Sequence, residues 1–415
     1  MSKGTIKFII GKAGTAKTTT LIQTVNTLLN QNKTVAIIAF THQAVNNIVE
    51  KFSTVDKTNN QNSSSTSSTN LTIKTIHSYF RITPDHEYEF DIDNFIDSVS
   101  SFGYNTYSLH KKKFDSLITN SKIKRKINLP DYLFVDELSL IPDVLLQIIF
   151  SFCRYSNLVL IGDLLQLNPV SKNKNPINVN ALQLLTDFNC TFHEALLISQ
   201  HLSNNIFIYK EYQESSKMIM TKNYRSNTEV QQIIDEVLGD YTNYQHYYFN
   251  DYEHIDDYTI LSSKYKYLKL MYSKTFHTGT IRIQTMIGNI KVNENDLMIL
   301  TTNINDEFVN GDIVQIVSEK IIRKKTDPEI QHMFSSEETI LPLLPYNYLT
   351  IHKSQGLGFK KVLIILDDMF EITMLYTALT RAREDIKFIV FKQENIEHLK
   401  LYTEAFKKLT KIIYK

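Results

Sequence analysis

A lysine and a threonine, Lys17 and Thr18, end a run of small residues that begins at Gly11. The run follows the apolar segment 6–10 and precedes the segment 19–29, whose leucines and valine fall at helical spacing. A small-residue loop between a strand and a helix points its backbone N–H groups at an anion. The pattern therefore predicts polyphosphate binding, in which Lys17 reaches the β- and γ-phosphates and the Thr18 hydroxyl holds Mg²⁺.

Ala16 is a departure inside this loop, because a second glycine usually precedes the lysine. Its methyl group is tolerable if the φ angle of Ala16 stays negative, although it narrows the space beside the phosphates. A chance turn of small residues is the alternative, and the remaining motifs of the chain decide against it. The residues expected around the phosphates are Gly11, Ala13, Gly14, Thr15, Ala16, Lys17, Thr18 and Thr19.

Two adjacent carboxylates, Asp136 and Glu137, follow the apolar run 132–135. Such a pair usually lies in a solvated turn, but the run predicts that this pair ends a buried strand. Beside a phosphate-binding loop, that position suits a metal ligand and a general base. We expect Asp136 to hold Mg²⁺ through water, next to Thr18, and Glu137 to orient the attacking water as its general base.

Three further polar residues have the types that transfer of a γ-phosphoryl group requires. Gln166 follows another predicted strand, 158–163, and its amide suits a hydrogen bond to the γ-phosphate or to the attacking water. A plain polar loop explains Gln166 equally well. Arg225 and Arg381 lie in the second half of the chain, and a guanidinium suits the charge that develops on the γ-phosphate. Either arginine alone is more often a surface ion-pair partner.

Composition sets broad limits on the kind of protein. The 415 residues suggest two or three domains, and 42% hydrophobic residues is an ordinary globular value. The net charge is +1, so any basic channel for nucleic acid must be local. Only two cysteines, Cys153 and Cys190, argue for a reducing compartment and against a disulfide framework or a zinc site. We expect no signal peptide and no membrane partner, which predicts a cytoplasmic protein.

Strands that alternate with helices predict an α/β fold with parallel sheets. A Ser/Thr/Asn-rich segment at 55–70 predicts a surface loop, and residues 81–130 predict an inserted subdomain because they lack this alternation. Ser226 and Glu229 have the spacing of a capping box at the start of a helix. The predicted buried strands are 6–10, 34–40, 131–137 and 158–163 in a first sheet, and 297–300, 362–366 and 386–390 in a second.

The order of these motifs resembles a superfamily 1 helicase, and the details resemble its B group, the Pif/RecD/Dda clade. The resemblance implies two RecA-like parallel-sheet domains, at 1–200 and 201–415, with a small inserted subdomain at 81–130 and a reduced insert at about 311–345. It also places the segment 309–314 at the Asn-Gly strand of the second domain. The matching segments are 11–18 for motif I, 39–44 for Ia, 75–78 for Ib, 136–139 for II, 162–169 for III, 223–226 for IV, 350–356 for V and 376–383 for VI.

This resemblance implies an ATP-dependent helicase that moves five-prime to three-prime on single-stranded DNA and unwinds forked duplex. ATP and Mg²⁺ would lie in the cleft between the two domains, with Gly356 near the nucleotide and Arg381 as an arginine finger. Threonine hydroxyls and histidines suit phosphate oxygens, and aromatic faces suit bases. For His77, a structural role is the alternative. The residues implied to contact the strand are Phe40, Thr41, His42, Thr75, His77, Thr350, His352 and Lys353.

Several alternatives remain open at this point. No glutamine precedes Gly11, so adenine selectivity is not expected to be strict and other NTPs are candidate substrates. A viral-type superfamily 1 RNA helicase is the nearest rival, and an ATPase that clamps nucleic acid without unwinding it is the second. A P-loop small-molecule kinase is disfavoured, since motifs Ia, Ib and V would then have no role. Replication or recombination proteins are candidate partners. The AT-rich, compact form suggests a phage, viral or mobile-element gene, hence host cytoplasm or nucleus.

Overall fold

The structure is a computed structural model in which the chain forms two compact units. The described part of the first unit ends at residue 163 and resumes at 215–222, and the second contains 165–167 and the described residues from 223 on. The predicted boundary at residue 200 lies outside the described residues, as do most of the predicted loop at 55–70 and of the predicted subdomain at 81–130. The described residues are 4–59, 70–80, 129–141, 149, 153, 156–163, 165–167, 215–249, 252–275, 277–305, 307–366 and 372–390.

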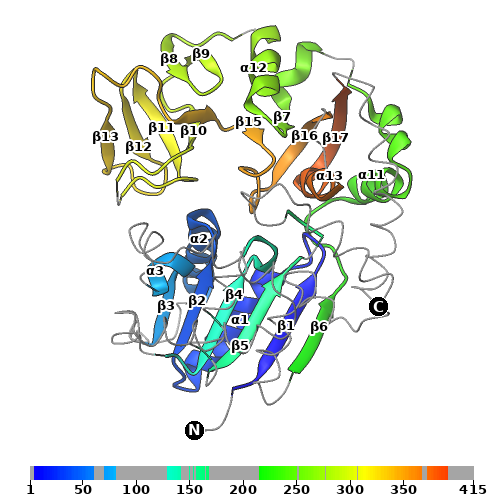
Figure 1. Cartoon of the computed structure of the whole chain (residues 1–415), viewed down its shortest axis with the longest axis vertical. Coiled ribbons are helices and arrows are strands. Elements are labelled where there is room, and N and C mark those ends of the chain that lie inside the picture. Colours follow the sequence, from blue (N-terminus) through cyan, green and yellow to red (C-terminus); the bar gives the residue numbers. More distant parts are fainter. Residues whose placement is uncertain are drawn as a thin grey trace, which may run out of the picture. The chain divides into compact units, whose positions relative to one another are not determined.

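Six parallel strands form the sheet of the first unit, in the order β3-β2-β4-β5-β1-β6 (Figure 1). The four strands predicted for the first sheet are confirmed, and β1 lies between β5 and β6. Because every strand runs the same way, all carboxyl ends meet at one edge of the sheet. The strands are β1 (Ile6–Gly11), β2 (Val35–Ala39), β3 (Leu71–Thr75), β4 (Tyr132–Asp136), β5 (Asn157–Gly162) and β6 (Ser215–Met220).

Two helices cover one face of this sheet with a shared apolar cluster. They are α1 (Lys17–Asn30) and α2 (His42–Asn59), and each follows directly from a strand end. Burial of this cluster holds both helices against the sheet. The predicted motifs I and Ia lie where these two helices begin. The buried members are Ile9, Leu21, Ile22, Val25, Leu28, Val35, Ile37, Ile48, Phe52, Phe134, Val159 and Ile161.

The second unit contains a smaller parallel sheet of four strands in the order β15-β7-β16-β17. The predicted strands 362–366 and 386–390 are confirmed as parts of β16 and β17. The described residues of this unit form three α-helices, and α13 leads directly into β17. The elements are β7 (Thr259–Ser262), β15 (Tyr348–Thr350), β16 (Phe359–Leu366), β17 (Ala382–Val390), α11 (Thr228–Gly239), α12 (Tyr265–Lys274) and α13 (Ile372–Leu379).

Strand β10 (Leu297–Leu300) corrects the prediction that residues 297–300 belong to the second parallel sheet. It pairs antiparallel with β11 and β14 in a separate five-stranded sheet, in the order β13-β12-β11-β10-β14. An apolar run shows that a strand is buried, but not which sheet buries it. The predicted insert at 311–345 supplies the other four strands: β11 (Ile313–Ser318), β12 (Ile321–Lys324), β13 (Gln331–Met333) and β14 (Leu343–Pro345).

The start of α11 also differs from the prediction by one residue. Asn227 caps the helix, since its side-chain oxygen accepts the Val230 N–H at 2.8 Å. Ser226 instead donates its hydroxyl to the Ala382 carbonyl at 2.8 Å, so the predicted capping box is wrong. Asparagine is as good a cap as serine, and tertiary contact with β17 decides between them.

Two further observations concern the cysteines and the possibility of a membrane-spanning helix. Cys153 is a free, buried thiol, and Cys190 lies outside the described residues. Among the helices that the structure describes, none combines the length and the apolarity needed to cross a membrane.

Candidate nucleotide and nucleic-acid site

The carboxyl edge of the first sheet brings together the segments predicted as motifs I, Ia, Ib and II and the start of the segment predicted as motif III. Strand pairing places Ala39 beside both Asp136 and Thr75, and Ile10 beside Gly162. Five connecting segments therefore begin along one edge, each at the position where its strand ends. Ligands of open α/β sheets bind at such an edge, so the fold gathers the residues that the sequence singled out.

The loop between β1 and α1 is closed on itself around Lys17. The Lys17 ammonium donates to the Gly11 carbonyl at 2.7 Å and to the Lys12 carbonyl at 2.8 Å. Thr15 is buried, and its hydroxyl donates to the Lys12 carbonyl at 2.8 Å. A Cβ at Gly11 would lie 2.4 Å from Thr15 Oγ1 and 2.8 Å from the Met220 carbonyl oxygen, so only glycine fits. These bonds hold the loop in one shape, and phosphate oxygens can replace the two carbonyl oxygens as partners of the Lys17 ammonium.

Ala16 has φ 62° and ψ 26°, which is the left-handed region. The condition under which we expected the methyl group to be tolerable, a negative φ, is therefore not met. Gly14, two residues earlier, also has a positive φ of 79°. The turn into α1 needs this left-handed residue, and an alanine there costs roughly 1–2 kcal/mol relative to glycine.

We expect Ala16→Gly to raise the free energy of unfolding by about 1 kcal/mol, because glycine relieves the left-handed strain. The gain is smaller than the strain itself, since glycine also has more freedom in the unfolded chain. Chemical denaturation of both proteins measures the difference. Ala16→Val is the matched opposite and should lower stability, because a β-branched residue tolerates positive φ even less. Equal stability of all three proteins would contradict the assigned backbone conformation.

Asp136 and Glu137 differ sharply in environment although they are adjacent. Asp136 is buried at 7% exposure, and its Oδ1 accepts the Glu137 N–H at 2.9 Å. Burial, together with the neighbouring Glu137 charge, raises the pKa of Asp136 to about 7. A buried carboxylate whose negative charge is poorly compensated is suited to bind a cation, because the bound cation would stabilise the charged form of the carboxylate.

Glu137 is held in the left-handed region, with φ 55° and ψ 46°, and is half-buried. It starts the short 3₁₀ helix η3 (Leu138–Leu140), whose Leu140 N–H bonds to the Glu137 carbonyl at 2.9 Å. Glutamate gains nothing from this conformation, so the surrounding structure imposes it. Strained non-glycine residues cluster at functional sites, which is compatible with a catalytic base at this point.

Gln166 lies in the segment 165–167, which belongs to the second unit. It is buried at 5% exposure. The neighbouring Leu167 N–H donates to Thr377 Oγ1 at 3.1 Å. Thr377 is fully buried on α13 and was not singled out from the sequence. Its place four residues before Arg381, inside the segment 376–383 assigned to motif VI, is the signal that could have identified it.

Arg381 and Arg225, the two predicted arginines, meet at one residue. Arg225 donates to the Thr380 carbonyl at 3.3 Å, and Arg381 NH2 donates to Thr380 Oγ1 at 3.1 Å. Arg381 is only 1% exposed, and it also bonds to the carbonyls of Thr377 at 2.9 Å and Leu357 at 3.1 Å. Arg225 is half-buried. In this conformation Arg381 is tied to backbone of its own unit, and Arg225 is the more accessible of the two.

The three predicted strand-contacting threonines share one geometry across both units. Each hydroxyl oxygen accepts the backbone N–H three residues ahead, at a turn that follows a strand. The distances are 3.1 Å from Thr41 to Ala44, 3.2 Å from Thr75 to Ser78 and 3.3 Å from Thr350 to Lys353. Because the oxygen is the acceptor in each case, its hydrogen is left to donate to another group, such as a phosphate oxygen.

Aromatic and basic side chains lie beside these threonines. The rings of Phe40 and His77 are neighbours, with centroids 5.8 Å apart, and His42 is half-buried at the start of α2. In the second unit, burial lowers the pKa of His352 and lowers that of Lys353 to about 8. Gly356, the predicted nucleotide contact, has φ 81° and closes the turn after β15.

Two family models match the chain. One, described as an AAA domain, covers residues 1–172, and the other, a viral superfamily 1 RNA helicase core domain, covers residues 297–390. No curated protein sequence matches the chain significantly.

Solved Pif1 helicases share the fold over nearly the whole chain. Pif1 from Bacteroides in complex with ADP-AlF3 and single-stranded DNA is 19% identical, with 98% of this chain and 94% of that chain covered and a TM-score of 0.52. Pif1 from Candida albicans is 16% identical over 98% and 96% of the two chains, also with a TM-score of 0.52. The chain has the fold of a Pif1-type superfamily 1 helicase.

A Pif1 structure that concerns DNA unwinding at forked duplex DNA is similar to the same degree, at 18% identity and a TM-score of 0.52, with 97% and 92% of the chains covered. Together these likenesses confirm the expected fold class, two α/β parallel-sheet units, and the resemblance that the motifs indicate. The role of each site residue stays a prediction.

Proposed function

We propose that the protein is an ATP-dependent helicase that moves five-prime to three-prime on single-stranded DNA and unwinds forked duplex. The observation that carries this proposal is the grouping, at one edge of a parallel sheet, of the loop around Lys17, the adjacent carboxylates Asp136 and Glu137, and the turns that begin at Thr41 and Thr75. The Pif1-type fold supports it, since solved Pif1 proteins include complexes with ADP-AlF3 and with single-stranded DNA.

In the proposed reaction, Lys17 releases the Gly11 and Lys12 carbonyls and binds the β- and γ-phosphates. Thr18 and Asp136 are the residues that fit Mg²⁺, because Asp136 is a buried carboxylate in need of a cation. When bound, Mg²⁺ neutralises charge that builds up on the phosphate oxygens. Glu137 takes the proton of the attacking water, and Gln166 orients that water.

The strand-binding part of the proposal rests on the repeated threonine turns. Thr41 and Thr75 in the first unit, and Thr350 in the second, present hydroxyl donors at the ends of parallel strands. Donors of this kind bind the phosphate backbone without reading base sequence. If ATP binding and hydrolysis change the grip of one unit relative to the other, the protein moves along the strand.

An RNA helicase is the second candidate, and one observation favours it. Residues 297–390 match the family model of a viral superfamily 1 RNA helicase core domain. Phosphate-directed donors serve both polymers, whereas a contact to the 2′-OH would select RNA.

Turnover of ATP, with and without nucleic acid, tests the proposal. We expect single-stranded DNA to stimulate hydrolysis and the protein to displace a strand from forked DNA. Stimulation without displacement would indicate a clamp, stronger stimulation by RNA would favour the second candidate, and no stimulation by either would contradict both. In the same assay, we expect GTP, CTP and UTP to be used within about a hundredfold of ATP in kcat/KM, which is about 2.7 kcal/mol.

A further inference from the structure

Strands β8 (Ile281–Thr285) and β9 (Gly288–Val292) form a two-stranded antiparallel hairpin next to α12 in the second unit (Figure 1). One side of the hairpin is packed, since Ile283, Ile290 and Val292 are all buried there. Side chains alternate between the two sides of a strand, so the residues between these lie on the open side. They are Arg282, Gln284, Asn289 and Lys291.

Arg282 and Lys291 lie directly opposite each other on this open side, and both are exposed. The Tyr272 hydroxyl donates to the Lys291 carbonyl at 3.1 Å and accepts the Lys291 N–H at 3.0 Å, so the Lys291 backbone groups point away from β8. The two residues are therefore a non-hydrogen-bonded pair, in which opposite Cα atoms are only about 4.5 Å apart. Like charges in this position destabilise a sheet, so stability of the hairpin does not explain them.

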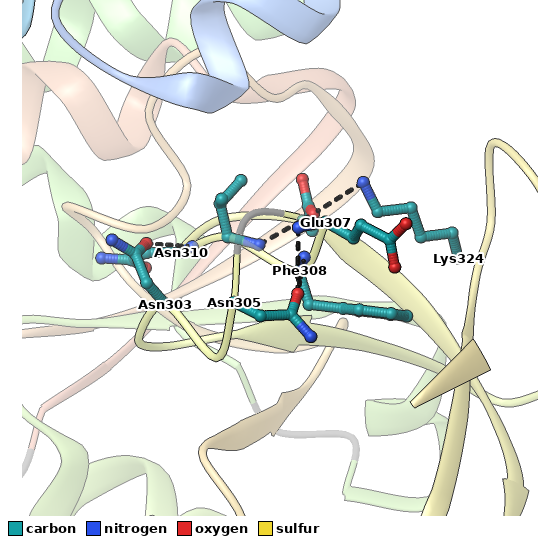
Figure 2. A network of polar contacts seen from close by, with 8 residues as sticks. Asn303, Asn305, Glu307, Phe308, Asn310 and Lys324 are labelled. Carbon is teal, nitrogen blue, oxygen red and sulfur yellow. Dashed lines mark hydrogen bonds and ion pairs between the residues drawn. The ribbon is translucent and has the colours of Figure 1, made fainter. Parts of the chain in front are cut away.

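No described carboxylate forms an ion pair with either of these two cations. Elsewhere in the unit, Lys324 pairs with Asp312 at 3.4 Å (Figure 2), and Lys361 pairs with Asp257 at 3.3 Å. Around the hairpin, by contrast, the sequence has no aspartate or glutamate from residue 258 to residue 293. The lysines and the arginine of that segment are Lys264, Lys266, Lys269, Lys274, Arg282 and Lys291.

An exposed apolar side chain, that of Ile340, borders the same side of the hairpin. The parallel pairing of Thr285 with Leu341 buries both residues, and the Leu341 N–H donates to the Gln284 carbonyl at 2.8 Å. Ile340, one residue before Leu341, therefore lies beside Gln284, and it is 56% exposed. We define the hairpin face as Arg282, Gln284, Asn289, Lys291 and Ile340.

We propose that the hairpin face docks a linear acidic segment of a partner protein, one that also carries an apolar side chain. Carboxylates of this segment bind between Arg282 and Lys291 and relieve their repulsion. Its apolar side chain covers Ile340, and the two carboxamides of the face bond its backbone. A phosphodiester backbone would complement the cations but would offer nothing to Ile340. The inference is independent of the proposed function, because it uses none of the residues assigned to the nucleotide or the strand.

Fluorescence anisotropy with a short labelled peptide tests the docking. The probe carries a block of aspartates followed by a leucine and a phenylalanine, and its control carries serines in place of the aspartates. We expect the wild-type protein to bind the acidic peptide with micromolar affinity that weakens as salt is raised, and not to bind the serine peptide. Arg282→Thr should weaken binding about fivefold, the upper value for one exposed ion pair, because threonine suits a strand but carries no charge. Ile340→Ser should also weaken it.

Lys291→Glu separates docking from a role in stability. The new carboxylate would face Arg282 across the hairpin, and an opposite-charge pair in this position stabilises a sheet. We therefore expect the melting temperature to rise slightly, while binding of the acidic peptide is lost. A lower melting temperature together with unchanged peptide binding would overturn the docking.

Lys360→Thr is the matched control, because Lys360 is an exposed strand lysine of the same unit, on β16, and should bind the peptide as the wild type does. No binding of the acidic peptide by the wild-type protein would overturn the docking, as would equal weakening by Lys360→Thr and Arg282→Thr. If Arg282→Thr and Ile340→Ser weakened DNA binding as much as peptide binding, the face would belong to nucleic acid instead. ATP turnover should stay at the wild-type rate in these variants, so a failure of the docking is distinguishable from a failure of the proposed function.

Discussion

Glu137→Gln should lower the kcat of ATP hydrolysis by about 10² to 10⁴, the contribution of a general base, while nucleotide affinity is retained. The amide keeps the size of the carboxylate but cannot take the proton of water. The substitution is also clean with respect to the backbone, because glutamine and glutamate are equally strained at φ 55°. Pre-steady-state turnover and nucleotide titration measure the two quantities separately.

Lys17→Ala provides the contrast, because it removes the ammonium that we expect to bind the phosphates. It should lose both nucleotide affinity and turnover, whereas Glu137→Gln loses turnover alone. Near-normal turnover in Glu137→Gln would require another base. A wild-type nucleotide affinity in Lys17→Ala would refute the assigned phosphate loop.

Removal of an arginine finger should cost about 10³ to 10⁵ in kcat, and the structure offers Arg225 and Arg381 for this role. We expect Arg225→Ala and Arg381→Ala both to bind ATP and to hydrolyse it very slowly, with no stimulation by single-stranded DNA. Lysine should rescue neither, because it lacks the planar fork of the guanidinium.

Stability distinguishes the two arginines. Arg381→Ala removes the donors to the buried Thr377 and Leu357 carbonyls, which should cost about 2 kcal/mol or more of folding free energy. Arg225→Ala removes a long bond to the Thr380 carbonyl at 3.3 Å and, because Arg225 is only half-buried, should lower the melting temperature less than Arg381→Ala does. Arg383, which is exposed, is the control. If Arg383→Ala lost DNA-stimulated turnover and Arg381→Ala kept it, the finger would be Arg383 and Arg381 would be structural.

The parallel strands and the loops that follow them could be predicted because each depends on local pattern. Apolar runs define β1, β2, β4 and β5, and the polar residues that follow each run then fall at one edge of the sheet. The backbone at Ala16 could not be predicted, because residue type favours negative φ and the required turn overrides it. The same holds for α11, where contact with β17 moves the cap from Ser226 to Asn227.

The pairing of strands that lie far apart in the sequence could not be predicted either. The run 297–300 is as apolar as any strand of a parallel sheet, yet it pairs antiparallel in another sheet. The four-residue strand β7 carries too short a pattern to be recognised, although it lies between β15 and β16. The burial of Arg381 could not be predicted from the sequence either. A motif gives the residue type, but it does not show that backbone carbonyls of the same unit accept the hydrogen bonds of the guanidinium.

The three threonine turns have a consequence for how tightly the strand can be held. In each, the hydroxyl that we propose contacts a phosphate is already held by the N–H three residues ahead. A locked side chain loses little rotational freedom when the strand arrives, so less of the binding energy is spent on ordering the protein. Preorganised donors of this kind allow a weak, sequence-independent grip to be made and released repeatedly without reshaping the loops.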